Sequence, residues 1–135
     1  MVELQILNRI LAEKSDSILV SNDITEEFFN EYKEEYDFIE SHKRQYGNIP
    51  DTETFLSEFP DFDIIKVDEQ DEYLVSTFRE EYLYRMSVPV ITRLAELLQT
   101  DSYEAVDYLK SQIPNLKITG AKKGIDIIHN ANDRL

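Results

Sequence analysis

One stretch of the sequence carries acidic side chains at a spacing that suits an ion. Residues 61–72, DFDIIKVDEQDE, place carboxylates at the first, third and twelfth positions of a twelve-residue loop, as calcium-binding loops do. The fifth position, however, is Ile65, which has no side-chain oxygen, and the sixth is Lys66, where the sharp turn of such a loop needs glycine. We therefore expect a surface loop rather than a calcium site, with Ile64, Ile65 or Val67 packing inward.

Other residue types that could support catalysis are present without the partners they need. His42 and His129 are far apart and have no companion at metal-ligand spacing, so we interpret both as surface residues. The segment GAKKG at 120–124 has basic residues between glycines but lacks the length and the terminal Gly-Lys-Ser/Thr of a phosphate-binding loop. No serine has a histidine at a recognisable spacing. The sequence predicts a chain without catalytic, metal or cofactor sites of its own.

Composition limits the cellular setting. The chain of 135 residues has no cysteine, which excludes disulfides and thiolate zinc sites and fits a reducing cytoplasm. The N-terminal segment carries glutamate and arginine inside its apolar run, so it does not have the pattern of a secretory signal. No stretch approaches the roughly 18 apolar residues of a membrane span. We expect a soluble, cytoplasmic protein without a membrane partner.

Charge is distributed unevenly along the chain. Acidic residues outnumber basic ones by 28 to 14, but residues 116–135 hold only 2 of the acidic and 4 of the basic residues. An acidic body repels phosphate groups, so any contact of residues 1–115 with DNA should be indirect. The carboxylates of residues 1–115 either keep the surface hydrated or bind a basic protein partner.

Apolar spacing is helical almost throughout, and three glycines and four prolines leave little turn chemistry for a multistranded sheet. We predict an all-α fold. The first helix should reach about Lys14 and bury a broad face, on which Val2, Ile6 and Ile10 widen a stripe of Leu4, Leu7 and Leu11. A long helix capped by Asp23 should run from Ile24 to about Tyr46, where Gly47 ends it. Its aromatic stripe should face the core, and its opposite side is acidic. The remaining predicted helices span 52–59 and about 69–86.

A helical hairpin is predicted near the end of the chain. Pro89 should either kink the preceding helix or start a new one, because proline lacks the backbone donor and restricts the residue before it. A short turn capped by Asp101 or Ser102 then joins two helices over about 89–113, which must run antiparallel. After Pro114 comes a linker, and the segment IDIIHNANDRL should form a short amphipathic helix, marginal alone and in need of a docking partner.

This layout resembles the N-terminal domain of DnaB-like hexameric replicative helicases, most closely the bacteriophage versions. The resemblance covers about residues 4–113. It rests on ILNRIL, on ITEEFFNEYKEEYDFIESHKRQYGNIPDTETFLSEF, and on YLVSTFREEYLYRMSVPVITRLAELLQTDSYEAVDYLKSQI. The matching positions are an aromatic after an acidic cap, a glycine before an Ile-x-x-x-x-Thr-Phe-Leu stretch, an arginine on a long helix and an aspartate in the hairpin turn: Phe28 or Phe29, Gly47, Ile49, Thr54, Phe55, Leu56, Arg85 and Asp101. Pro89 departs from the uninterrupted helix of that family.

The resemblance implies a non-catalytic role within a larger protein. Residues 1–115 would form the collar domain, which associates with itself as a dimer, and as a hexamer in the parent, and binds primase and a helicase loader. Residues 116–135 would be the linker, whose helix docks on the motor domain of a neighbouring subunit. ATP and magnesium would belong to that motor domain, downstream of Leu135, which would then end a fragment rather than the protein. If phage-encoded, the protein would work in the bacterial host cytoplasm.

Two other interpretations remain open. The chain could be a free-standing acidic adaptor or inhibitor that binds a basic factor, or the helicase-binding domain of a primase, although Met1 at the start of the first helix argues against the latter. For the collar interpretation we predict two sets of interaction residues, each of which could instead be ordinary core or solvated helix. The hairpin set is Val90, Ile91, Arg93, Leu94 and Leu97. The docking-helix set is Ile125, Ile128 and Leu135.

Overall fold

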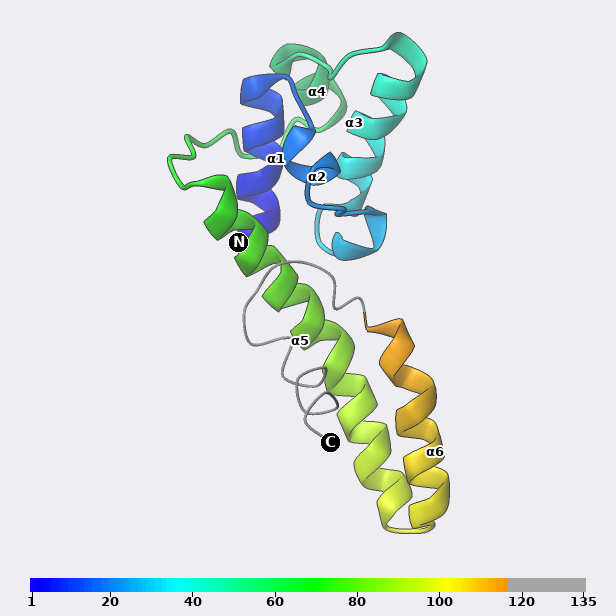
Figure 1. Cartoon of the computed structure of the whole chain (residues 1–135). Helices are drawn as coiled ribbons and strands as arrows, with labels where there is room; N and C mark the ends of the chain where they lie inside the picture. The colour runs from blue at the N-terminus through cyan, green and yellow to red at the C-terminus, as the bar shows by residue number, and fades with distance from the viewer. Residues whose placement is uncertain (117–135) are drawn as a thin grey trace. The chain divides into compact units, whose positions relative to one another are not determined.

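A computed structural model describes residues 1–116, and these residues are helical without any strand (Figure 1). The all-α prediction is confirmed. The chain divides into two compact units, the first over Met1–Arg79 and the second beginning at Glu80. The predicted boundary at 115/116 lies one residue before the end of the described part, and it stays a prediction. The elements are α1 (Val2–Glu13), α2 (Ser17–Val20), the short 3-10 helix η1 (Glu26–Phe28), α3 (Lys33–Tyr46), α4 (Thr52–Glu58), α5 (Asp71–Leu98), α6 (Ser102–Gln112) and the 3-10 helix η2 (Ile113–Asn115).

Helix α1 lies at the centre of the first unit. All six apolar residues predicted to form its broad buried face are at most 8% exposed, namely Val2, Leu4, Ile6, Leu7, Ile10 and Leu11. Two polar side chains are buried with them, and both have partners. The Asn8 amide donates to the carbonyls of Leu4 (2.9 Å) and Asp63 (3.0 Å), and its oxygen accepts from the N–H of Ile65 (2.9 Å). Because a buried polar group without partners is costly, this bonding lets α1 be enclosed almost all round.

Buried Glu3 explains why one predicted helix boundary is wrong. Its carboxylate accepts the N–H groups of Asn30 (3.0 Å), Glu31 (3.3 Å) and Tyr32 (3.0 Å). Tyr32 is the N-cap of α3, so that helix begins at Lys33 rather than Ile24. The N–H groups of residues 30–32 lie at or before the N-cap of α3, so no helical hydrogen bond satisfies them and they need another acceptor. A carboxylate beside a helix N-terminus is also favoured by the helix dipole. Glu3 therefore caps α3 from another helix.

Asp23, the predicted cap, has a different conformation. Its φ is +55°, in the left-handed region, so it belongs to a turn and caps no helix. The chain then passes through η1 and an extended Phe29 before α3. This irregular path lets the adjacent Phe28 and Phe29 both become buried, at 2% and 3% exposure, and both rings contact Phe78, with centroids 5.9 and 4.9 Å away. Consecutive positions on one helix would point about 100° apart.

The ends of α3 and α4 follow their sequence signals. Gly47 ends α3 in the left-handed conformation, at φ +82°, and its N–H donates to the carbonyl of Lys43 (2.7 Å). That conformation is open to glycine without steric cost. Asp51 caps α4, because its carboxylate accepts the N–H of Thr54 (2.7 Å). These interactions place Phe55, which is fully buried, at the centre of an aromatic cluster.

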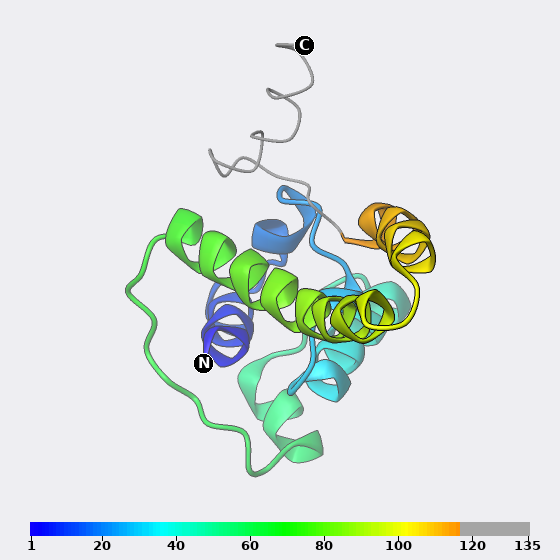
Figure 2. The same ribbon diagram turned by 90° about the horizontal axis from the view of Figure 1, so that it is seen from below.

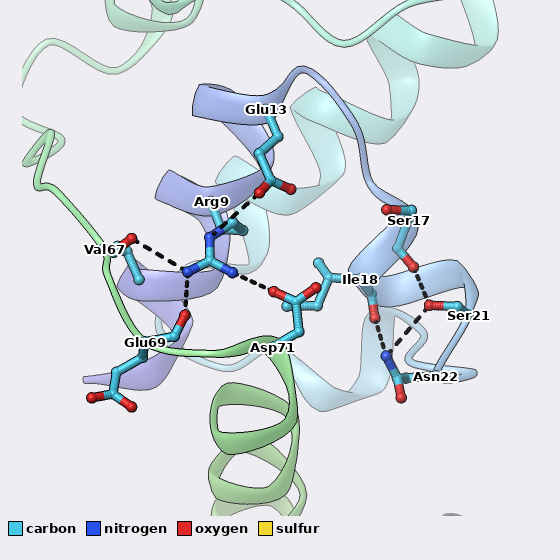
Figure 3. Close-up of polar contacts among 9 residues, drawn as sticks. All are labelled: Arg9, Glu13, Ser17, Ile18, Ser21, Asn22, Val67, Glu69 and Asp71. Atoms are coloured by element: carbon cyan, nitrogen blue, oxygen red, sulfur yellow. Dashed lines mark hydrogen bonds and ion pairs between the residues drawn. The ribbon is translucent and has the colours of Figure 1, made fainter.

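The segment between α4 and α5 is held against α1 by Arg9. Its guanidinium donates to the carbonyls of Val67 (3.3 Å) and Glu69, and it pairs with the carboxylates of Asp71 and Glu13 (Figure 3). Figure 3 also shows the small polar turn of α2, in which Ser21 and Asn22 bond back to earlier carbonyls. The guanidinium binds the first residue of α5 and the two carbonyls just before it, so it fixes where α5 begins.

The same segment differs in part from the predicted surface loop. Phe62 is the apolar side chain that packs inward, at 8% exposure, and Val67 is half-buried. Ile64 and Ile65 remain exposed, at 49% and 39%. The Ile65 N–H bonds to Asn8, so the backbone rather than the isoleucine side chain anchors this stretch.

Candidate interaction surface

Helices α5 and α6 form a hairpin in the second unit. Of the two alternatives predicted for Pro89, the start of a new helix is wrong, since α5 continues as one helix from Asp71 to Leu98 with Pro89 inside it and exposed to solvent. Proline can be accommodated when the rest of the helix is stabilised by packing, although it removes one backbone hydrogen bond. Figures 1 and 2 show α6 returning beside the second half of α5. The predicted antiparallel hairpin is thus present.

The turn has the predicted chemistry. Asp101 is the N-cap of α6, and its Oδ1 accepts the N–H groups of Tyr103 (3.0 Å) and Glu104 (3.2 Å). Its own N–H donates to the carbonyl of Leu97 (2.8 Å), which closes the end of α5. Only residues 99–101 separate the two helices, so they are held close together.

The predicted hairpin residues divide between two faces of α5. Leu97 is 7% exposed, and Val90 and Leu94 are half-buried. Steps of four and three residues put these three on one face, which lies toward the interior of the hairpin together with fully buried Ala105 of α6. Ile91, in contrast, is 63% exposed. Whether the first three also serve an interface stays a prediction.

Ile91 belongs to an apolar stripe that the sequence reasoning did not isolate. Exposed side chains recur on α5 at steps of four, three, four and three residues, namely Tyr84, Val88, Ile91, Ala95 and Leu98. This is the heptad spacing by which one helix packs along another. The signal was present in the sequence, but the neighbouring Val90, Leu94 and Leu97 have the same spacing, and only burial distinguishes the two series.

Helix α6 and the first residue of η2 present a second stripe of the same kind. Val106, Leu109 and Ile113 follow at steps of three and four residues and remain 46%, 36% and 46% exposed. We call the two stripes together the hairpin surface. Monomeric soluble proteins seldom leave so many aligned apolar side chains in water, so this pattern is typical of a face that packs against other helices.

Arg93, the charged member of the predicted hairpin set, is exposed on another side of α5. Its guanidinium lies 3.4 Å from the Glu96 carboxylate one turn later. Such an exposed pair contributes little to stability, of the order of 0.2–0.5 kcal/mol. At about 100° per residue, Arg93 lies about 200° around the helix from Ile91, roughly opposite the exposed stripe. Whether Arg93 serves an interface stays a prediction.

The docking-helix residues Ile125, Ile128 and Leu135 lie outside the described residues, as does His129. Within residues 1–116, no grouping of three or more histidine, aspartate or glutamate side chains could hold a metal ion. No helix in the same range combines the length and the apolar character needed to cross a bilayer.

Comparisons of the chain with protein-family models, with curated proteins and with solved structures found no match. The likeness to DnaB-like helicase domains thus rests on the residues quoted above, and the hairpin surface has to be interpreted from its own chemistry.

Proposed function

We propose that this chain is the non-catalytic N-terminal domain of a DnaB-like replicative helicase, and that it joins subunits through the hairpin surface. The observation that carries the proposal is the pair of exposed heptad stripes on α5 and α6. Two hairpins that face each other would bury both stripes in a four-helix arrangement, in which the same surface serves on each subunit. Primase or a helicase loader would then bind elsewhere on the acidic domain.

The size of the expected effect follows from Ile91. Burying one isoleucine side chain contributes about 1.5–3 kcal/mol. In a symmetric dimer the residue occurs twice, so replacing it should cost about 3–6 kcal/mol, which weakens the dissociation constant by about 10²–10⁴-fold. A glutamate there would add the cost of a desolvated charge.

The test is sedimentation equilibrium of residues 1–135 over a wide concentration range, with Ile91→Glu and a matched control. Ser111→Glu introduces the same charge on the same hairpin at an exposed residue of α6, which comes two residues after Leu109 and so lies on another side of that helix. We expect the wild type and Ser111→Glu to associate and Ile91→Glu to stay monomeric with unchanged helical circular dichroism. A wild type that is monomeric at every concentration would contradict the proposal and favour the acidic adaptor, as would association that Ile91→Glu leaves intact.

A further inference from the structure

Two carboxyl groups and one ammonium group meet in the first unit where the start of α2 contacts α3. Asp16, the residue before α2, is only 6% exposed. The Lys43 ammonium on α3 donates to both Asp16 carboxylate oxygens at 2.9 Å. Glu40 precedes Lys43 by three residues, so it shares that face of α3. The three side chains thus connect the corner between α1 and α2 to the middle of α3.

Glu40 is the group whose position needs explanation. Its Oε2 atom is buried, and no N–H or O–H group of the described residues donates to it. The Asp16 carboxyl group is close enough to Glu40 to share a hydrogen bond, which acts on the pKa values of both groups. Two ionised carboxylates repel each other and have no hydrogen to share, whereas one proton between them makes a short, strong hydrogen bond. This geometry therefore accommodates a neutral Glu40 better than an ionised one.

The surrounding charges indicate which carboxyl group holds the proton. Burial, the hydrogen bond to Asp16 and the Asp16 charge raise the pKa of Glu40 to about 7, while Lys43 and Arg44 act in the opposite direction. Burial also acts to raise the pKa of Asp16, but its hydrogen bonds to Lys43 and Glu40 outweigh that effect and lower it. The proton thus resides on Glu40, and the Asp16–Lys43 ion pair stays intact beside it.

The other groups near Glu40 do not replace it as the titrating site. Glu40 lines an open pocket of about 570 Å³ with Thr25, Glu26, Tyr36, Asp37, Ser41 and Arg44. Burial, followed by the charges of Glu40 and Glu26, raises the pKa of Tyr36 to about 12, so its phenol stays neutral. Glu26, Asp37 and Arg44 are exposed at the pocket rim. An ionised Glu40 would therefore add negative charge to a pocket that already has two carboxylates.

We propose that Asp16, Glu40 and Lys43 form a proton-operated latch between the start of α2 and α3, closed when Glu40 is protonated and loosened when it ionises. The sign follows from linkage. Because the folded chain holds the Glu40 proton to a higher pH than the unfolded chain, where the carboxyl titrates near its ordinary value of 4.5, the contribution of Glu40 to stability is greatest at low pH. The contribution of this residue is lost as the pH rises from about 4.5 through about 7.

The latch can be tested with urea unfolding of the whole chain at several pH values from about 5.5 to 8.5, a window that spans the transition. Glu40→Gln replaces the protonated carboxyl by a neutral amide that can still donate to Asp16, and it should remove most of the decline in the unfolding midpoint. Glu34→Gln removes the same charge from an exposed position of α3 and should leave the decline unchanged. Equal declines in Glu40→Gln and the wild type would overturn the proposal.

A carbon-13 titration of the side-chain carboxyl groups in the wild type requires no variant to fold, and it reads carboxyl groups rather than histidines. We expect the Glu40 signal to titrate near pH 7, well above those of exposed glutamates. A Glu40 midpoint in the ordinary range of exposed glutamates would refute the latch.

Discussion

The capping of α3 by Glu3 yields a specific prediction for Glu3→Gln. Glutamine has nearly the same size, so packing around the 6%-exposed side chain is retained and only the bonding changes. The carboxylate offers acceptors to three N–H groups, those of Asn30, Glu31 and Tyr32. The amide keeps one oxygen and replaces the other by an NH₂ group, which is a donor facing donors. At least one backbone N–H would lose its partner in a buried site.

The magnitude follows from these contacts. A hydrogen bond to a charged group contributes about 1.5–3 kcal/mol, and a buried donor left without a partner costs about 1–3 kcal/mol. Allowing for the two bonds that the glutamine oxygen can retain in place of Oε1, we expect Glu3→Gln to lower the free energy of unfolding by about 2–4 kcal/mol. That is a large share of the roughly 5–15 kcal/mol typical of a domain.

Urea unfolding followed by circular dichroism measures the loss, with the exposed Glu34→Gln as the control for charge. Amide hydrogen exchange supplies a local readout, because the N–H groups of residues 30–32 should be protected in the wild type and exchange faster in Glu3→Gln. A change below about 0.5 kcal/mol, the range of ordinary surface substitutions, would refute the capping role, as would rapid exchange of these amides in the wild type.

Two further substitutions test the core and the long helix. Phe55→Ala should lower the free energy of unfolding, measured with urea, by about 3–5 kcal/mol, because its ring is fully buried among other aromatic rings. The centroids of the neighbouring rings lie at 4.8 Å (Phe62), 5.1 Å (Phe59) and 6.1 Å (Phe38). A loss under about 1 kcal/mol would mean that the cluster is not packed as described. Pro89→Ala should stabilise the chain by about 1–3 kcal/mol in thermal unfolding, since alanine restores a backbone donor inside α5; a lower melting temperature would show that the proline is needed where it stands.

The sequence was sufficient for the features that depend on local chemistry. Helical periodicity predicted the all-α class and the buried face of α1, and single residues predicted where helices end, as with Gly47 in its left-handed conformation and Asp101 in the hairpin turn. These signals act over one or two turns, so they can be read without knowing what lies opposite in the fold.

Features that depend on distant partners could not be predicted. The start of α3 is set by Glu3, almost thirty residues earlier, and the buried pair of Phe28 and Phe29 favours an irregular path over a continuous helix. Pro89 does not start a new helix, because the rest of the 28-residue helix α5 outweighs the low helix propensity of this one residue. In the hairpin, two heptad series on α5 look alike in sequence, and only packing decides that the series with Ile91 is the one left exposed.

The two units use their apolar residues in different ways, and this difference supports an association role for the hairpin. The first unit encloses its apolar and aromatic side chains around α1 and satisfies the buried polar groups of Glu3, Asn8 and Asp16. Among residues 80–116, only Tyr82, Leu97 and Ala105 fall below 9% exposure. Two helices alone cannot surround a core, so their outward stripes remain in water unless other helices cover them. A second hairpin of the same sequence offers matching stripes, which is why we expect self-association to depend on Ile91 rather than on the acidic surface.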